Sequence, residues 1–87
     1  MNDVSSAGKL ADRSLLIVDA EKTFVSRFSR EMEQRGYRVE AVETARAGIA
    51  AIESRPPAYA VIDLKLGDGS GLDVLAALSK KRPDARG

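Results

Sequence analysis

The chain has 87 residues, enough for one small domain, and its 14 basic and 13 acidic residues give a formal net charge of +1. This balance provides no overall field that attracts nucleic acid or membrane, and no run approaches the roughly 18 apolar residues of a membrane span. Cysteine and histidine are absent, which excludes disulfides, thiolate chemistry and the commonest general base. The amino end lacks the apolar core of a signal peptide, so we expect a cytoplasmic protein that contacts no membrane and no nucleic acid directly.

The first third of the chain predicts a leader, a strand and a helix. Residues 1–13 mix charges with small residues and have no apolar period, which indicates a flexible leader. Ser14–Asp19 is an apolar run that ends in an acid, as a buried strand does. Gly36 lies where a left-handed C-cap ends a helix. The helix before it has one apolar face, formed by Phe24, Val25, Phe28 and Met32.

The middle of the chain predicts a second strand and a second helix. Tyr37–Val42 alternates in part between apolar and polar residues, which is typical of an edge strand. Thr44 has the residue type of an N-cap for the helix that follows. Pro56 and Pro57 end that helix, because the residue before a proline disfavours helical geometry.

The last third predicts a buried strand, a turn and a third helix. Tyr59–Asp63 is almost wholly apolar, as in a parallel strand covered on both faces. We interpret Gly67–Gly71 as a tight turn, because a dinucleotide fingerprint should directly follow the first strand. Ser70 followed by Asp73 resembles a capping box, and the helix stops before Pro83. The β-α-β-α-β-α order with right-handed crossovers predicts an α/β fold with a parallel sheet.

Two carboxylates stand at the ends of predicted strands. Asp19 follows the first strand and Asp63 the third, and the carboxyl ends of neighbouring parallel strands form one cleft. Such a pair suggests a divalent-cation site, a phosphoryl acceptor, or both. Aspartate after a strand is also a common turn cap, so spacing alone leaves a structural role open.

The runs "LLIVD" and "AVIDLKLGDGSGLDVL" resemble the receiver domain of two-component response regulators. The resemblance covers residues 14–86, and within receivers it is closest to the redox-responding global regulators. It implies a truncated flavodoxin-like fold with a three-stranded parallel sheet of order 2-1-3. Residues 14–87 are then an incomplete receiver domain without its last two strands and helices.

The resemblance also implies roles for individual residues. Asp63 is expected to take a phosphoryl group from a sensor histidine kinase or another phosphodonor, with Mg²⁺. Asp19, Asp63 and the backbone carbonyl of Lys65 are the expected metal ligands. Receivers usually carry a second acid where this chain has Ala20, and Glu21 is the nearest substitute. We therefore expect weak Mg²⁺ binding and impaired phosphorylation.

Other functions stay open. A strand Tyr59–Leu64 at the sheet edge would offer unpaired backbone groups, so we expect a homodimer or swapped oligomer. A pseudo-receiver that only pairs with other proteins is the main alternative, and a mass that does not change with concentration would contradict such pairing. A third alternative is a nucleotide binder that uses the same cleft. We do not expect an enzyme.

Overall fold

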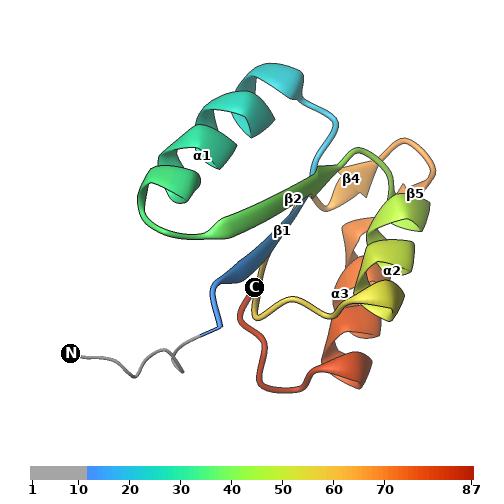
Figure 1. The fold of residues 1–87 in the computed structure, drawn as a ribbon. Coiled ribbons are helices and arrows are strands. Elements are labelled where there is room, and N and C mark those ends of the chain that lie inside the picture. Colours follow the sequence, from blue (N-terminus) through green and yellow to red (C-terminus); the bar gives the residue numbers. More distant parts are fainter. Residues whose placement is uncertain (1–11) are drawn as a thin grey trace.

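The fold is a parallel sheet between two helical layers, and the computed structural model describes residues 12–87. The strands are β1 (Ser14–Val18), β2 (Arg38–Val42) and β3 (Tyr59–Ile62), in the order β2-β1-β3. The helices are α1 (Lys22–Gln34), α2 (Ala45–Ser54) and α3 (Gly71–Lys81). Figure 1 shows α1 on one face of the sheet and both α2 and α3 on the other. The predicted α/β class and strand order are confirmed.

The central strand β1 is buried on both faces. Its side chains from Leu15 to Val18 are between 0 and 3% exposed, because β1 has a neighbour on each edge and a helical layer over each face. Side chains alternate along a strand, so Leu16 and Val18 both face α2 and α3. There they join a core that contains Ile52 of α2 and Val74 of α3.

Helix α1 covers its face of the sheet only in part. None of its residues is buried, although Val25, Phe28 and Met32 are half-buried. Phe24 remains 39% exposed and stacks on Phe28, with 5.4 Å between the ring centroids. The predicted apolar face is therefore present, but much of it remains in contact with solvent.

The predicted helix ends agree with the structure, although within residues 12–87 Ser70 and Asp73 do not form the reciprocal hydrogen bonds of a capping box. Gly36 has a φ of +94°, the left-handed conformation that glycine adopts most easily. The hydroxyl of Thr44 accepts a hydrogen bond from the N–H of Ala47 at 3.0 Å, and that of Ser70 accepts one from Leu72 at 3.0 Å. Within residues 12–87, no helix is both long and apolar enough to cross a membrane.

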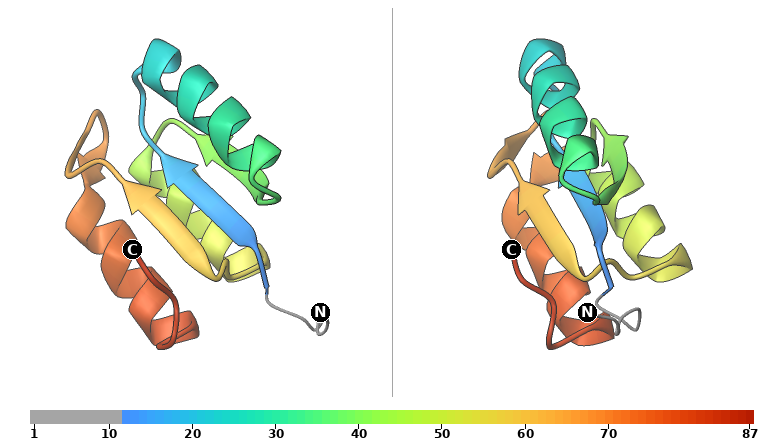
Figure 2. Two further views of the ribbon diagram at one scale, coloured as in Figure 1. Left: turned by 90° about the vertical axis from the view of Figure 1, so that its left-hand side faces the viewer. Right: turned by 60° about the vertical axis from the view of Figure 1, so that its left-hand side comes forward.

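A small hairpin between β3 and α3 was not predicted. Strand β4 (Lys65–Leu66) pairs antiparallel with β5 (Gly69–Ser70), and Gly67 and Asp68 form the turn between them. Figure 2 shows this hairpin beyond the carboxyl end of β3. Strands of two residues are too short for an alternating pattern, so the sequence indicated only a turn.

The outer edge of β3 is partly paired, which corrects the expectation for Tyr59–Leu64. Arg86 forms a parallel bridge with Tyr59. The N–H of Arg86 donates to the carbonyl of Ala58 at 2.9 Å, and its carbonyl accepts from the N–H of Ala60 at 2.8 Å. The expectation of a wholly unpaired edge is therefore wrong for the first half of the strand.

Most of the expected leader, residues 1–11, lies outside the described residues. Arg13 is already part of the fold, because its carbonyl accepts from the N–H of Arg38 at 2.9 Å. Its guanidinium lies 5.2 Å from the ring centroid of Tyr37, which meets Tyr59 edge-on with 5.4 Å between centroids. Asp12 accepts from Arg82 Nη1 at 2.7 Å. Asp12 and Arg13, which the sequence predicted to be part of the leader, thus make contacts within the described fold.

Asp12 predicts a pH dependence of stability. The backbone N–H of Ser14 and then the Arg82 guanidinium lower the pKa of Asp12 from 3.8 to about 2. A folded-state pKa below the ordinary value stabilises the fold above pH 3.8, and this contribution is lost as the pH falls towards 2. The Asp12 side chain is 39% exposed, so we expect an effect below about 1 kcal/mol.

Thermal melts of the wild type and Asp12→Asn between pH 6 and pH 2 test this prediction. The wild type is expected to melt at the higher temperature near pH 6, and the difference is expected to disappear near pH 2. A difference that stays constant over this range contradicts the assignment.

Candidate functional site

The parallel pairing brings Asp19 and Asp63 to the same edge of the sheet. Val18 of β1 is in register with Ile62 of β3, and each is followed directly by one of the two acids. The N–H of Asp63 donates to the carbonyl of Val18 at 2.8 Å, and the N–H of Asp19 donates to Val42 at 3.0 Å. These bonds fix both backbones where the sequence predicted a cleft.

Each carboxylate is oriented by the turn that follows it. Asp19 Oδ1 accepts from the N–H of Glu21 at 2.9 Å, and Asp63 Oδ1 accepts from the N–H of Lys65 at 3.3 Å. Asp63 is half-buried. Over residues 12–87, the second oxygen of either carboxylate has no protein hydrogen-bond donor. Each acid therefore keeps one oxygen for a ligand.

Glu21 serves as the N-cap of α1. Its Oε1 accepts from the N–H of Phe24 at 2.6 Å, which satisfies a helix amide that has no partner within the helix. The cap uses one carboxylate oxygen and holds the Glu21 side chain against the first turn of α1. The next residue, Lys22, pairs with Glu43 at 2.9 Å, and that hydrogen bond raises the pKa of Lys22.

The oxygen atoms that this site offers are of the type that a hard cation prefers, but they are too few to fill its coordination shell. Asp19, Asp63 and the Lys65 carbonyl offer carboxylate and carbonyl oxygens, and Mg²⁺ prefers oxygen ligands and usually keeps several waters. Ala20, exposed between β1 and α1, adds none from its side chain. Among residues 12–87, no group of three or more acidic, histidine or cysteine side chains could hold a metal. The donor set fits Mg²⁺ but leaves much of its coordination to water.

Gly71, the first residue of α3, packs against the backbone of Asp63. Its N–H donates to the carbonyl of Leu64 at 2.9 Å. A Cβ on Gly71 would overlap the carbonyl oxygen of Asp63 and lie 2.8 Å from its carbonyl carbon. The sequence indicates this glycine only as part of a turn, because nothing in a local pattern indicates a close approach to a residue earlier in the chain.

The same hydrogen bonds disfavour the nucleotide alternative. A phosphate at the start of α3 would need free backbone amides. The N–H of Gly71 is bonded to Leu64, and the N–H of Leu72 is bonded to the Ser70 hydroxyl. The glycine-rich segment therefore uses these amides to build the hairpin and cap the helix.

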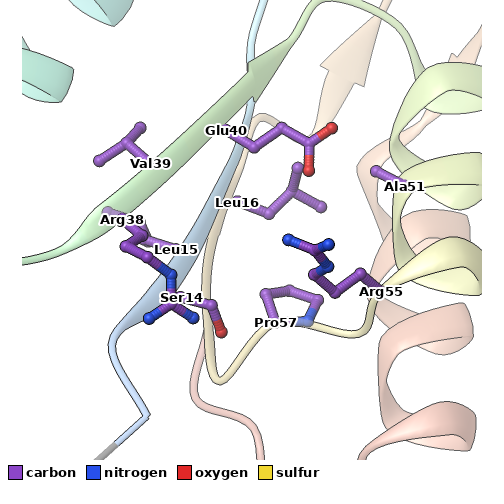
Figure 3. Close-up of a pocket in the computed structure, with 9 residues that line it drawn as sticks. All are labelled: Ser14, Leu15, Leu16, Arg38, Val39, Glu40, Ala51, Arg55 and Pro57. Carbon is purple, nitrogen blue, oxygen red and sulfur yellow. The ribbon is translucent and has the colours of Figure 1, made fainter.

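A separate cavity of about 180 Å³ lies towards the opposite end of the sheet, between β2 and α2 (Figure 3). Glu40 and Arg55 extend into it. Its other lining residues are Ser14, Leu15, Leu16, Arg38, Val39, Ala51 and Pro57. Neither Asp19 nor Asp63 contributes to it, so this cavity is not part of the two-acid site.

Comparison with known families agrees with this fold. Residues 15–86 match the family described as the response regulator receiver domain. The chain therefore belongs to the receiver domain family of response regulators.

Two curated relatives are similar over most of the chain. The photosynthetic apparatus regulatory protein RegA of Rhodobacter capsulatus is 54% identical over 76 residues, which are 87% of this chain and 41% of RegA. The acid tolerance regulatory protein ActR of Sinorhizobium medicae is 55% identical over 75 residues, 86% of this chain and 39% of ActR. The chain thus spans about two fifths of these regulators.

Solved structures share the fold. A response regulator of Burkholderia pseudomallei, with a phosphorylated aspartic acid and a calcium ion, has a TM-score of 0.80 and 31% identity over 86% of this chain and 44% of that one. TrrA of Thermotoga maritima, solved with Mg²⁺-BeF, has a TM-score of 0.76 and 25% identity over 84% and 64% of the two chains. TrrA in complex with the histidine kinase ThkA has a TM-score of 0.74 and 25% identity, over 84% of this chain and 63% of that one.

The close approach of Gly71 predicts a strong effect of a single methyl group. Gly71→Ala is expected to push against the Asp63 backbone and to lower the free energy of unfolding by about 1–3 kcal/mol, the usual cost of overpacking. Gly67→Ala is the matched control, because a Cβ at Gly67 meets nothing within 4 Å. Urea unfolding of both variants tests the prediction, and equal stabilities would contradict it.

Proposed function

We propose that this chain is a phosphoacceptor module that takes one phosphoryl group on the Asp63 carboxylate. The observation that carries the proposal is the pairing of β1 with β3, which puts the half-buried Asp63 next to Asp19 at the carboxyl edge of the sheet. A carboxylate oxygen forms a bond to phosphorus while the bond between phosphorus and the donor breaks. The module is itself modified in this step, so we do not regard it as an enzyme.

We further propose Mg²⁺ as the cofactor, held by Asp19, Asp63 and the backbone carbonyl of Lys65. When bound, the ion neutralises charge on the phosphoryl oxygens during transfer. The second oxygens of both carboxylates, which have no donor in the described structure, support this assignment. The calcium ion and Mg²⁺-BeF in the two solved relatives are consistent with it.

Ala20 is expected to weaken the site. It stands where a second acid would supply another oxygen to the ion, and Glu21, the nearest acid, caps α1. Mg²⁺ requires near-octahedral coordination at short distances, so the loss of one charged ligand lowers its affinity. We infer slow phosphorylation that needs high Mg²⁺ concentrations.

The natural donor we propose is the phosphohistidine of a sensor histidine kinase. The phosphorus–nitrogen bond of the donor breaks, and the histidine nitrogen takes up a proton. The complex of TrrA with ThkA supports a donor of this class. Self-association through β3 stays a prediction, although Arg86 leaves less of that edge unpaired than expected. The absence of direct nucleic-acid contact and the cytoplasmic location also stay predictions.

Incubation with Mg²⁺ and acetyl phosphate tests the phosphoacceptor proposal. The intact mass of the wild type is expected to rise by one phosphoryl group, because the Asp63 oxygen attacks the small donor directly. Asp63→Asn is the matched control and is expected to gain nothing. Folded wild-type protein that gains no mass at any Mg²⁺ concentration contradicts the proposal and favours the pseudo-receiver alternative.

The effect of Ala20 is tested by adding the missing acid. Ala20→Asp is expected to lower the Mg²⁺ concentration at half-maximal phosphorylation by on the order of tenfold, because the number of charged ligands sets the affinity for divalent cations. Ala20→Asn, similar in size but uncharged, is the control. An equal Mg²⁺ requirement in Ala20→Asp and the wild type shows that Ala20 does not limit the site.

A further inference from the structure

The tip of the β4–β5 hairpin is fastened to the first turn of α2 by Asp68. Its Oδ1 accepts from the N–H of Ala45 at 2.7 Å, and its Oδ2 accepts from the N–H of Arg46 at 3.0 Å. Asp68 lies 23 positions after Ala45 in the chain. Figure 1 shows β5 beside the start of α2. The contact therefore joins two elements that the sequence alone does not connect.

This carboxylate completes the N-terminus of α2. The first N–H groups of a helix have no partner within the helix. Thr44 bonds the N–H of Ala47, and Asp68 bonds the two amides before it. A negative charge at this end is favoured by the helix dipole, and hydrogen bonds to a charged acceptor are stronger than neutral ones. The N–H groups of Arg46 and Ala45 accordingly lower the pKa of Asp68.

Packing adds to this attachment. Leu66 of β4 is half-buried against the hydrophobic core. A Cβ on Gly69 of β5 would lie 3.5 Å from the Cβ of Ala45, an ordinary contact distance. At its base the hairpin begins just after Asp63 and returns to it through Gly71. It is thus held at its base by Gly71 and at its tip by α2.

Lys65 lies inside this hairpin, two residues after Asp63. Its N–H donates to Asp63 Oδ1 at 3.3 Å, and its register with Ser70 sets the direction of its peptide group. We propose that Asp68 is a positioning residue, whose attachment to α2 holds the Lys65 backbone carbonyl in place as a ligand for the metal beside Asp63. This inference rests on the proposed function, because the Lys65 carbonyl acts as a ligand only if the site binds Mg²⁺.

Asp68→Asn in the full chain tests the inference, since an amide keeps the shape but offers one acceptor oxygen instead of two. The Mg²⁺ concentration at half-maximal phosphorylation by acetyl phosphate is expected to rise about tenfold, as for other residues that support metal ligands. The rate at saturating Mg²⁺ is expected to stay near that of the wild type. Amide hydrogen exchange at Lys65 and Leu66 is expected to become faster.

Two further variants serve as controls. Asp73→Asn removes the same charge from a residue in the first turn of α3 whose carboxylate accepts no hydrogen bond from residues 12–87, and it is expected to change neither readout. Asp68→Glu keeps the carboxylate and is expected to recover part of the Mg²⁺ affinity. Melting temperatures of all variants establish that they are folded.

The results separate this inference from the phosphoacceptor proposal. A rate that falls by the same factor at every Mg²⁺ concentration, or unchanged exchange at Lys65, overturns the positioning role and leaves Asp68 as a helix cap only. If the wild type gains no phosphoryl group, the proposed function fails. Exchange at Lys65 in Asp68→Asn then still decides whether Asp68 orders the hairpin.

Discussion

Strand β1 is the constraint on which the rest of the structure depends. Four consecutive apolar side chains need cover on both faces, and a parallel strand obtains it only when crossover helices pack on each side. This requirement places α1 on one face and both α2 and α3 on the other. It also makes β2 and β3 the two neighbours of β1, so the site at the carboxyl edge is a consequence of how the core is buried.

The segment between β3 and α3 determines the local geometry of the site. The end of β3 places Asp63, but the positions of the peptide groups after it depend on contacts with other parts of the chain. Gly71 allows α3 to begin against the Asp63 backbone, and Asp68 ties the far end of the hairpin to α2. The site is therefore supported by helices on one side of the sheet only, while α1 contributes chiefly through the loop that carries Asp19.

Much of the fold could be predicted because its signals are local. Apolar runs gave the strands to within a residue at each end, and Thr44, Ser70 and Gly36 marked helix ends by residue type. Parallel topology then placed the two acids together. The roles of these acids and of Lys65 came from the resemblance to receivers, and they remain proposals.

The features that the sequence did not predict depend on contacts between segments that are distant in the chain. The capping of α2 by Asp68 joins residues 23 positions apart, and the fit of Gly71 against Asp63 depends on where a helix begins in space. The bridge from Arg86 to Tyr59 changed the expected edge of β3, although the residues around Arg86 carry no strand pattern. Residue type could not indicate any of these contacts.

The aromatic pair at the amino end of β3 has a practical consequence. The chain contains no tryptophan, and its only two tyrosines are Tyr37 and Tyr59, which meet edge-on. Tyr59 begins β3 while Asp63 follows it, so the Cα of Tyr59 lies about 13 Å along the strand from that of Asp63. Ultraviolet absorption and intrinsic fluorescence therefore monitor the packing of Tyr37 against Tyr59 at the opposite end of the sheet, and an added chromophore is needed to follow events at Asp63 optically.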